Sequence, residues 1–177
     1  MPLIKAGELR DDPWRFLADD EALPADGPVA VSLARWRREE NALVARGLPL
    51  GIRLKAGEHP LSIAEALGHF ALIALEFPKF TDGRAYSYAR LLRERFGYKG
   101  ELRAVGQVLR DQLLFMQRCG FDAFEIAHTD AAELWRKAIA EISVFNQPTG
   151  ERGVTRPRAA PAPPGPSSDR DGRRLRS

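Results

Sequence analysis

Residues 71–77 read ALIALEF, an almost continuously apolar run, and the polar loop PKFTDG follows directly at residues 78–83. Apolar side chains at nearly every position indicate a central strand that is buried on both faces of a sheet. A segment of helical period begins at Arg84. Strand, loop and helix therefore follow one another as they do in a parallel α/β sheet.

The same unit, a short apolar strand and then a helical segment, recurs before and after residues 71–77. Glycines such as Gly47, Gly97 and Gly120 end the helical segments. The expected strands are residues 29–33, 50–54, 71–77, 102–105 and 124–126, and the expected helices are residues 38–46, 62–68, 84–96, 108–118 and 131–145.

These units predict a three-layer α/β fold, with a mostly parallel sheet of about five strands and helices on both faces. A half-barrel of the same β/α units stays open as the alternative. The periodicity of a sequence does not reveal whether its sheet opens or curls.

Charge and composition divide the chain near residue 147. The 177 residues carry 27 basic and 24 acidic side chains, a net charge of +3. Residues 148–177 hold seven Arg and three acidic residues, which leaves 20 basic and 21 acidic side chains, a net charge of −1, in residues 1–147. Six of the 13 prolines also follow residue 147. We predict a single α/β domain over residues 1–147 and a disordered Pro/Arg-rich tail over residues 148–177.

The basic pI of about 9.3 belongs to this tail, because the predicted domain is close to neutral. We therefore expect no nucleic-acid partner. The sequence contains no run of eighteen apolar residues, and its first residues lack the apolar core of a signal peptide. A cytoplasmic protein without a membrane partner is the expectation.

Motifs for a bound cofactor or metal are missing from the sequence. Cys119 is the single cysteine, which rules out a four-cysteine zinc site and an iron–sulfur cluster ligated by this chain alone. His59, His69 and His128 lie far apart and in no ligand spacing. No glycine-rich dinucleotide loop, phosphate-binding Gly-Lys-Ser/Thr loop or serine nucleophile elbow occurs. We expect no cofactor and no metal, so that any electron carrier would come from a partner.

Polar side chains follow the third and fourth predicted strands, and the carboxyl ends of neighbouring parallel strands meet at one edge of a sheet. Asp82 and Gly83 also precede a helix, whose free N–H groups favour an anion. We predict one continuous charged surface that binds an anion or a partner, with catalytic residues unknown. Its candidates are Lys79, Asp82, Gly83, Arg84, Ser87, Arg90, Arg103, Asp111 and Gln112.

An ordinary network of ion pairs is the other interpretation of these charges. Asp82 would then only cap a helix, and Arg84 and Arg90 would pair with acidic neighbours such as Glu94, Glu101 or Asp111. The residue pattern does not decide between the two interpretations.

Four stretches resemble an uncharacterised bacterial family, number nine hundred and thirty-four among the domains of unknown function. They are LEFPKFTDGRAYSYARLLR at residues 75–93, GELRAVG at 100–106, RDQ at 110–112 and RCGFDAF at 118–124. The resemblance covers most of residues 29–147. The sequence departs from the family at Asn146, where a Tyr is expected before Gln147, and in its basic tail.

The resemblance implies a role in bacterial sulfite reduction, because such genes lie beside those of the sulfite reductase haemoprotein subunit and adenylylsulfate reductase. The expected function is an accessory or electron-delivery partner of that haemoprotein subunit or of another sulfate-assimilation enzyme, in sulfur assimilation and cysteine biosynthesis. The family is also described as a probable oxidoreductase of sulfite reduction, and the sequence leaves open whether this chain catalyses a reaction. The alternative is a small enzyme or carrier that binds an oxyanion with the loop at residues 79–90.

Overall fold

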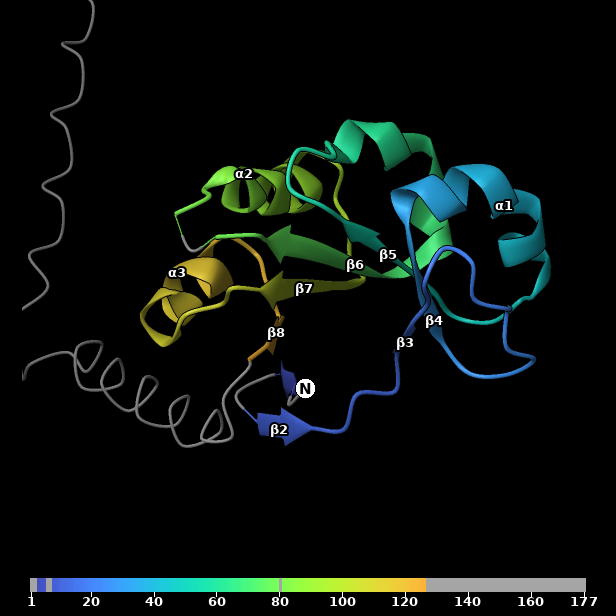
Figure 1. The fold of residues 1–177 in the computed structure, drawn as a ribbon. Helices are drawn as coiled ribbons and strands as arrows, with labels where there is room; N and C mark the ends of the chain where they lie inside the picture. The colour runs from blue at the N-terminus through green and yellow to red at the C-terminus, as the bar shows by residue number, and fades with distance from the viewer. Residues whose placement is uncertain (1–2, 6–7, 80, 127–177) are drawn as a thin grey trace, which may run out of the picture. The chain divides into compact units, whose positions relative to one another are not determined.

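The computed structural model describes residues 3–5, 8–79 and 81–126 (Figure 1). Contacts divide the chain into two units, Met1–Asn146 and Gln147–Ser177. All statements below concern the described part of the first unit. The helix predicted at residues 131–145 and the tail predicted at residues 148–177 lie outside the described residues.

Eight strands form a single mixed sheet. They are β1 (Leu3–Lys5), β2 (Glu8–Arg10), β3 (Arg15–Phe16), β4 (Val29–Ser32), β5 (Leu50–Leu54), β6 (Phe70–Phe77), β7 (Glu101–Gly106) and β8 (Ala123–Glu125). Their order across the sheet is β2-β1-β8-β7-β6-β5-β4-β3. Strands β3 to β8 are parallel to one another, whereas β1 pairs antiparallel with both β2 and β8.

Helical segments connect the parallel strands. They are α1 (Leu33–Ala45), the 3-10 helix η1 (Pro60–His69), α2 (Arg84–Arg90) with its π-helical continuation η2 (Leu91–Arg95), and the 3-10 turn η3 (Arg110–Gln112) that leads into α3 (Leu113–Arg118). Helix α1 starts five residues before the predicted residue 38, because the Ser32 side chain caps it by accepting the Arg35 N–H at 3.0 Å.

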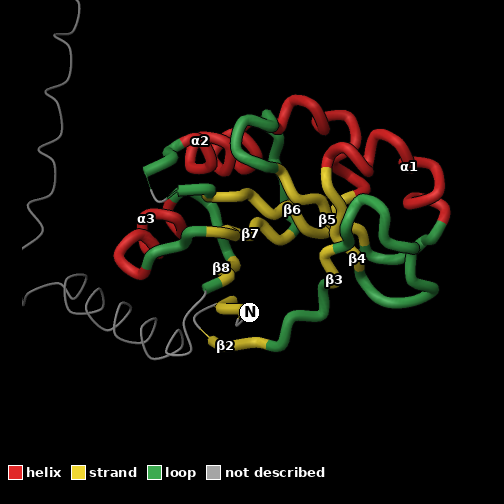
Figure 2. The backbone as a smooth tube through the Cα atoms, in the orientation of Figure 1, coloured by secondary structure: helices red, strands yellow, loops and turns green. Residues whose placement is uncertain are grey.

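Strands β4 to β8 follow one another in space in the same order as along the chain. Each crossover therefore moves in one direction, and crossovers of one hand then place every connecting helix on the same face. Figure 2 shows these helices on one side of the strands. The α/β class is confirmed, but the sheet is a curled half-barrel with eight strands. The prediction of about five strands in three layers, with helices on both faces, is corrected in this respect.

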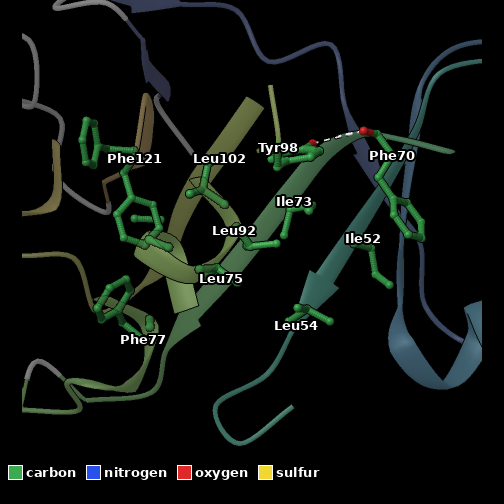
Figure 3. Close-up of a cluster of buried hydrophobic side chains, with 14 of the residues drawn as sticks. Ile52, Leu54, Phe70, Ile73, Leu75, Phe77, Leu92, Tyr98, Leu102 and Phe121 are labelled. Atoms are coloured by element: carbon green, nitrogen blue, oxygen red, sulfur yellow. Dashed lines mark hydrogen bonds between the residues drawn. The ribbon is translucent and has the colours of Figure 1, made fainter. Parts of the chain in front are cut away.

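The main hydrophobic core lies between the sheet and these helices. Ile73, Leu75 and Phe77 of β6 alternate toward this face and are fully buried, with Leu92 of η2 packed over them (Figure 3). The Tyr98 hydroxyl, at the edge of the same cluster, donates a hydrogen bond of 3.1 Å to the Phe70 carbonyl. Cys119 is also buried in this core.

The opposite, concave face of the sheet is crossed by the N-terminal part of the chain. Residues 11–14, which we call the strap, connect the two edge strands β2 and β3 across the open side of the half-barrel (Figure 1). Every second side chain of each strand points to the concave face. Ser32 of β4, Arg53 of β5 and Arg103 of β7 are among them and lie in one row across the strands. Polar side chains of β4, β5 and β7 therefore lie on the concave face.

Among the described residues, no helix has both the length and the apolar character that a membrane span requires.

Candidate functional site

The loop after β6 folds around an ion pair between Asp82 and Arg84. The Arg84 side chain donates from Nε at 3.0 Å and from Nη2 at 2.6 Å to the two oxygens of the Asp82 carboxylate, which also accepts the Arg84 backbone N–H at 3.1 Å. These hydrogen bonds from Arg84 lower the pKa of Asp82 to about 2. The Asp82 carboxylate is thus already bound by the charged side chain of Arg84 and by the first backbone N–H of α2.

The surroundings of this pair agree in part with the predicted surface. A cavity of about 480 Å³ brings together Lys79, Asp82, Gly83 and Arg84. Four further candidates lie on neighbouring elements: Ser87 and Arg90 are exposed on α2, Asp111 is exposed on η3, and Gln112 is half-buried there. We call residues 79–90 the rim loop. Whether it binds an anion or a partner stays a prediction.

Arg103 lies apart from the rim loop, which corrects its expected place on the same charged surface. Its side chain is fully buried on the concave face, where both oxygens of Asp12 accept hydrogen bonds of 2.6 and 3.0 Å. Glu101 accepts a further hydrogen bond of 2.9 Å, and the ring of Phe16 lies 5.6 Å from the guanidinium carbon. The reason is the alternation along β7, which turns residue 103 away from the helices.

A second cavity, of about 440 Å³, opens on the concave face at the carboxyl ends of β4, β5 and β6. We call its polar residues the concave mouth; they are Asp19, Ser32, Arg53, Lys55 and Glu76. Arg53 Nε donates to Glu76 at 3.2 Å, and the Ser32 hydroxyl donates to Asp19 at 2.5 Å. Among the described residues, no group of three or more His, Cys, Asp or Glu side chains has a metal-binding arrangement.

Sequence reasoning missed the concave mouth, although a signal was present. Ser32 is the last residue of β4, and Arg53 and Glu76 are the next-to-last residues of β5 and β6. A single polar residue near the end of each apolar strand marks the face and the edge at which ligands of parallel sheets bind. Asp19 and Lys55 carry no comparable signal, because they lie outside the strands.

Apolar side chains are exposed beside the rim loop. Phe115 of α3 is 51% exposed and Leu109 is 40% exposed. The Phe115 ring packs against Tyr86 of α2, with 4.9 Å between ring centroids, and Tyr86 in turn contacts Phe77 at 5.1 Å. We call Leu109, Phe115 and Tyr86 the apolar rim patch. Burial raises the pKa of Tyr86, and the nearby charges of Cys119 and Asp111 act in the same direction.

Comparison with protein families gives a match for this chain. A family model described as a bacterial protein of unknown function, DUF934, matches residues 51–156, which is more than half of the 177 residues. The match includes residues 51–54 of β5, the whole of β6 to β8, the rim loop and the apolar rim patch. No curated protein matches the sequence.

Proposed function

The chain belongs to the bacterial family of unknown function DUF934, and we propose that it acts in sulfite reduction as an accessory or electron-delivery partner of another enzyme. The partner is the haemoprotein subunit of sulfite reductase or another enzyme of sulfate assimilation. If the role is electron delivery, the redox carrier is bound by the partner and not by this chain. The pathway comes from the sequence resemblance, and the apolar rim patch supports a partner role.

The apolar rim patch is the observation that supports a partner role. An aromatic side chain that is half exposed, backed by a second aromatic ring and bordered by charged residues, has the composition of a protein interface, in which a few apolar anchors lie inside a polar rim. Phe115 is such an anchor, with Tyr86 behind it. Arg84, Arg90 and Asp111 are the charged residues of the neighbouring elements.

Substitution of Phe115 tests this role. Phe115→Ser should weaken binding of the full-length protein to the purified haemoprotein subunit by about tenfold or more, because loss of an aromatic anchor removes most of its apolar contact. Binding is measured on an immobilised haemoprotein subunit. In a deletion strain, the same variant should fail to restore growth on sulfite, whereas sulfide should restore growth regardless of the variant.

Leu61→Ser is the matched control, because Leu61 is 59% exposed on η1 and lines a cavity with Trp36 and Glu40 of α1 that contains no residue of the apolar rim patch. It should bind and complement like the wild type. Equal binding of the Phe115 and Leu61 variants would contradict the docking surface. A deletion strain that grows normally on sulfate would contradict the role in sulfite reduction itself.

Oxyanion binding by the rim loop is the alternative function, and the cavity of about 480 Å³ beside Lys79 and Arg84 is the observation in its favour. The ion pair with Asp82 weakens it, since the guanidinium already has a carboxylate partner. Loss of sulfite binding in an Arg84→Gln variant would support this alternative over the partner role.

A further inference from the structure

The concave mouth has the position of a ligand site. It lies at the carboxyl ends of β4, β5 and β6, which is where parallel β/α sheets bind ligands. Its cavity of about 440 Å³ falls within the range of small-molecule pockets. Phe16 and Leu17 form an apolar wall, and Ala30 and Val31 belong to the lining from β4.

Arg53 presents unused hydrogen-bond donors to this cavity. Its Nε is held by Glu76 at 3.2 Å, while its two terminal nitrogens have no hydrogen-bond partner among the described residues. The side chain is 41% exposed, so that part of the guanidinium is withdrawn from water. A guanidinium that is fixed at Nε and open at both terminal nitrogens matches the geometry of a bidentate oxyanion.

Two further positive groups face the same space. Lys55 lines the cavity, and its ammonium has no partner in the described part of the chain. Helix α1, 13 residues long, begins at Leu33 directly after the lining residue Ser32, so that its positive end lies at the mouth.

The two acidic residues of the mouth are already engaged by neighbours. Glu76 accepts from Arg53, and Asp19 accepts the Ser32 hydroxyl. The main-chain carbonyls of Ala18 and Asp19 also accept hydrogen bonds from Arg35 and Arg38 of α1, and both of these arginines pair with Glu39. The mouth groups without a partner among the described residues are therefore the terminal nitrogens of Arg53 and the ammonium of Lys55, while Asp19 and Glu76 balance the formal charge of these two cations.

The buried Arg103 does not contribute to this site. Phe16, which lines the cavity, also stacks on the Arg103 guanidinium, and Asp12 and Glu101 satisfy that guanidinium on its other sides. Arg53 and Lys55 are thus the cations that a ligand would reach.

We propose that the concave mouth binds a small inorganic oxyanion of the sulfite, sulfate or phosphate type, with Arg53 as the bidentate donor and Lys55 as the second cation. This site is separate from the rim loop and from the apolar rim patch. It does not depend on the proposed partner role, because it rests on the geometry of β4, β5 and β6.

Calorimetric titration of the full-length protein with sulfite, sulfate, phosphate and acetate tests the proposal. The wild type should bind at least one of the three inorganic anions, and Arg53→Gln should weaken that binding by about tenfold or more, because charge-assisted hydrogen bonds are lost. Lys55→Gln, at an exposed position, should weaken it several-fold without lowering the melting temperature. Glu76→Gln should strengthen binding, since it removes the carboxylate that competes for Arg53.

Arg10→Gln is the control variant, because Arg10 is exposed on β2, at the edge of the sheet opposite to β3 and β4, and lines neither cavity, and it should bind like the wild type. The proposal is overturned if the wild type binds none of the inorganic anions at about 10 mM, or if Arg53→Gln and Lys55→Gln both bind like the wild type. Tighter binding of acetate than of the inorganic anions would also overturn it in favour of a carboxylate ligand. None of these outcomes bears on binding of the haemoprotein subunit.

Discussion

Arg103 shows how a buried charge is accommodated in this fold. Its side chain has no exposed surface, and Asp12 and Glu101 supply three hydrogen-bond contacts to its guanidinium. Burial by itself would lower the pKa of Arg103, but the hydrogen bond to Asp12 and the charge of Glu101 raise it, so the side chain stays charged. Lys5 also pairs with Glu101 at 2.7 Å, so that each of the two carboxylates has a cationic partner.

Removal of Arg103 should therefore be costly. Arg103→Met should lower the free energy of unfolding by about 3–5 kcal/mol, because it leaves Asp12 without a cation and Glu101 with Lys5 alone. Urea denaturation measures the change, and Arg84→Met, at an exposed ion pair, is the control expected to unfold like the wild type. The double variant Asp12→Asn/Arg103→Met should cost less than the sum of the single variants. Strict additivity would show that the two residues do not act as a pair.

Residue chemistry alone identified Arg103 as notable but misplaced it. Its position inside a predicted strand suggested the polar rim, whereas its partner Asp12 lies 91 residues away in a segment with no periodic pattern. The pair Asp82–Arg84 was within reach of sequence reasoning, since both residues lie in one turn. A contact between distant segments follows from the pairing order of the strands, which local spacing does not contain.

At the scale of elements, the ends of β6 and β7 are held together at Gly106. This residue has a φ of +91°, and a Cβ atom built on it would lie 2.5 Å from the Phe77 carbonyl oxygen. That oxygen is fixed, because it accepts the Gln107 N–H at 2.8 Å. The close approach of the β6 and β7 backbones thus fixes the point at which the loops after these two strands begin.

Gly106→Ala should destabilise the protein more than a glycine substitution elsewhere. We expect a loss of about 2–4 kcal/mol in the free energy of unfolding, from the left-handed backbone and from the clash with Phe77. Gly97→Ala is the control, since Gly97 has a φ of +63° but nothing within 4 Å of an added Cβ. It should lose only about 1–2 kcal/mol, for the backbone conformation alone. Equal losses in thermal or urea unfolding would argue against the clash.

Four of the five predicted strands, β4 to β7, and most helical segments could be predicted because each is long enough to show a period, whereas β8 has only three residues. Helix-forming residues 84–95 end at Phe96 and Gly97 as expected, although part of the helix is π-helical. Strands β1, β2 and β3 have two or three residues each, too few to show alternation. These strands pair at the two edges of the parallel sheet, where β1 lies between β8 and β2, and β3 lies beside β4.

At the scale of the molecule, the curl of the sheet was left open between two alternatives. Both alternatives contain the same β/α units, and only the order of the strands distinguishes them. The order from β8 to β4 runs in one direction, which fixes the helices on one face and leaves the other to the strap and to the concave mouth. This arrangement places Arg53 of β5 and Arg103 of β7 on the concave face.

The Pro/Arg-rich segment after residue 147 should be dispensable for the stability of the domain. Truncation after Gln147 should leave the melting temperature unchanged within about 2 °C, because the segment contains too few apolar residues to pack on a core. Calorimetry of the full-length and truncated proteins makes the comparison. A decrease of about 10 °C would show instead that the segment docks on the domain.

The strap has a consequence for the order of events during synthesis. Asp12 leaves the ribosome long before Arg103, its partner 91 residues later, and β1 must likewise wait for β8. Contacts of this range are slow to form, because a long loop has to close before they are made. Until then, Arg103 lacks its hydrogen bonds to the Asp12 carboxylate, and the edge of β8 is not yet paired with β1. We therefore expect the final step of folding to be the return of the earliest segment over a half-barrel that is otherwise complete.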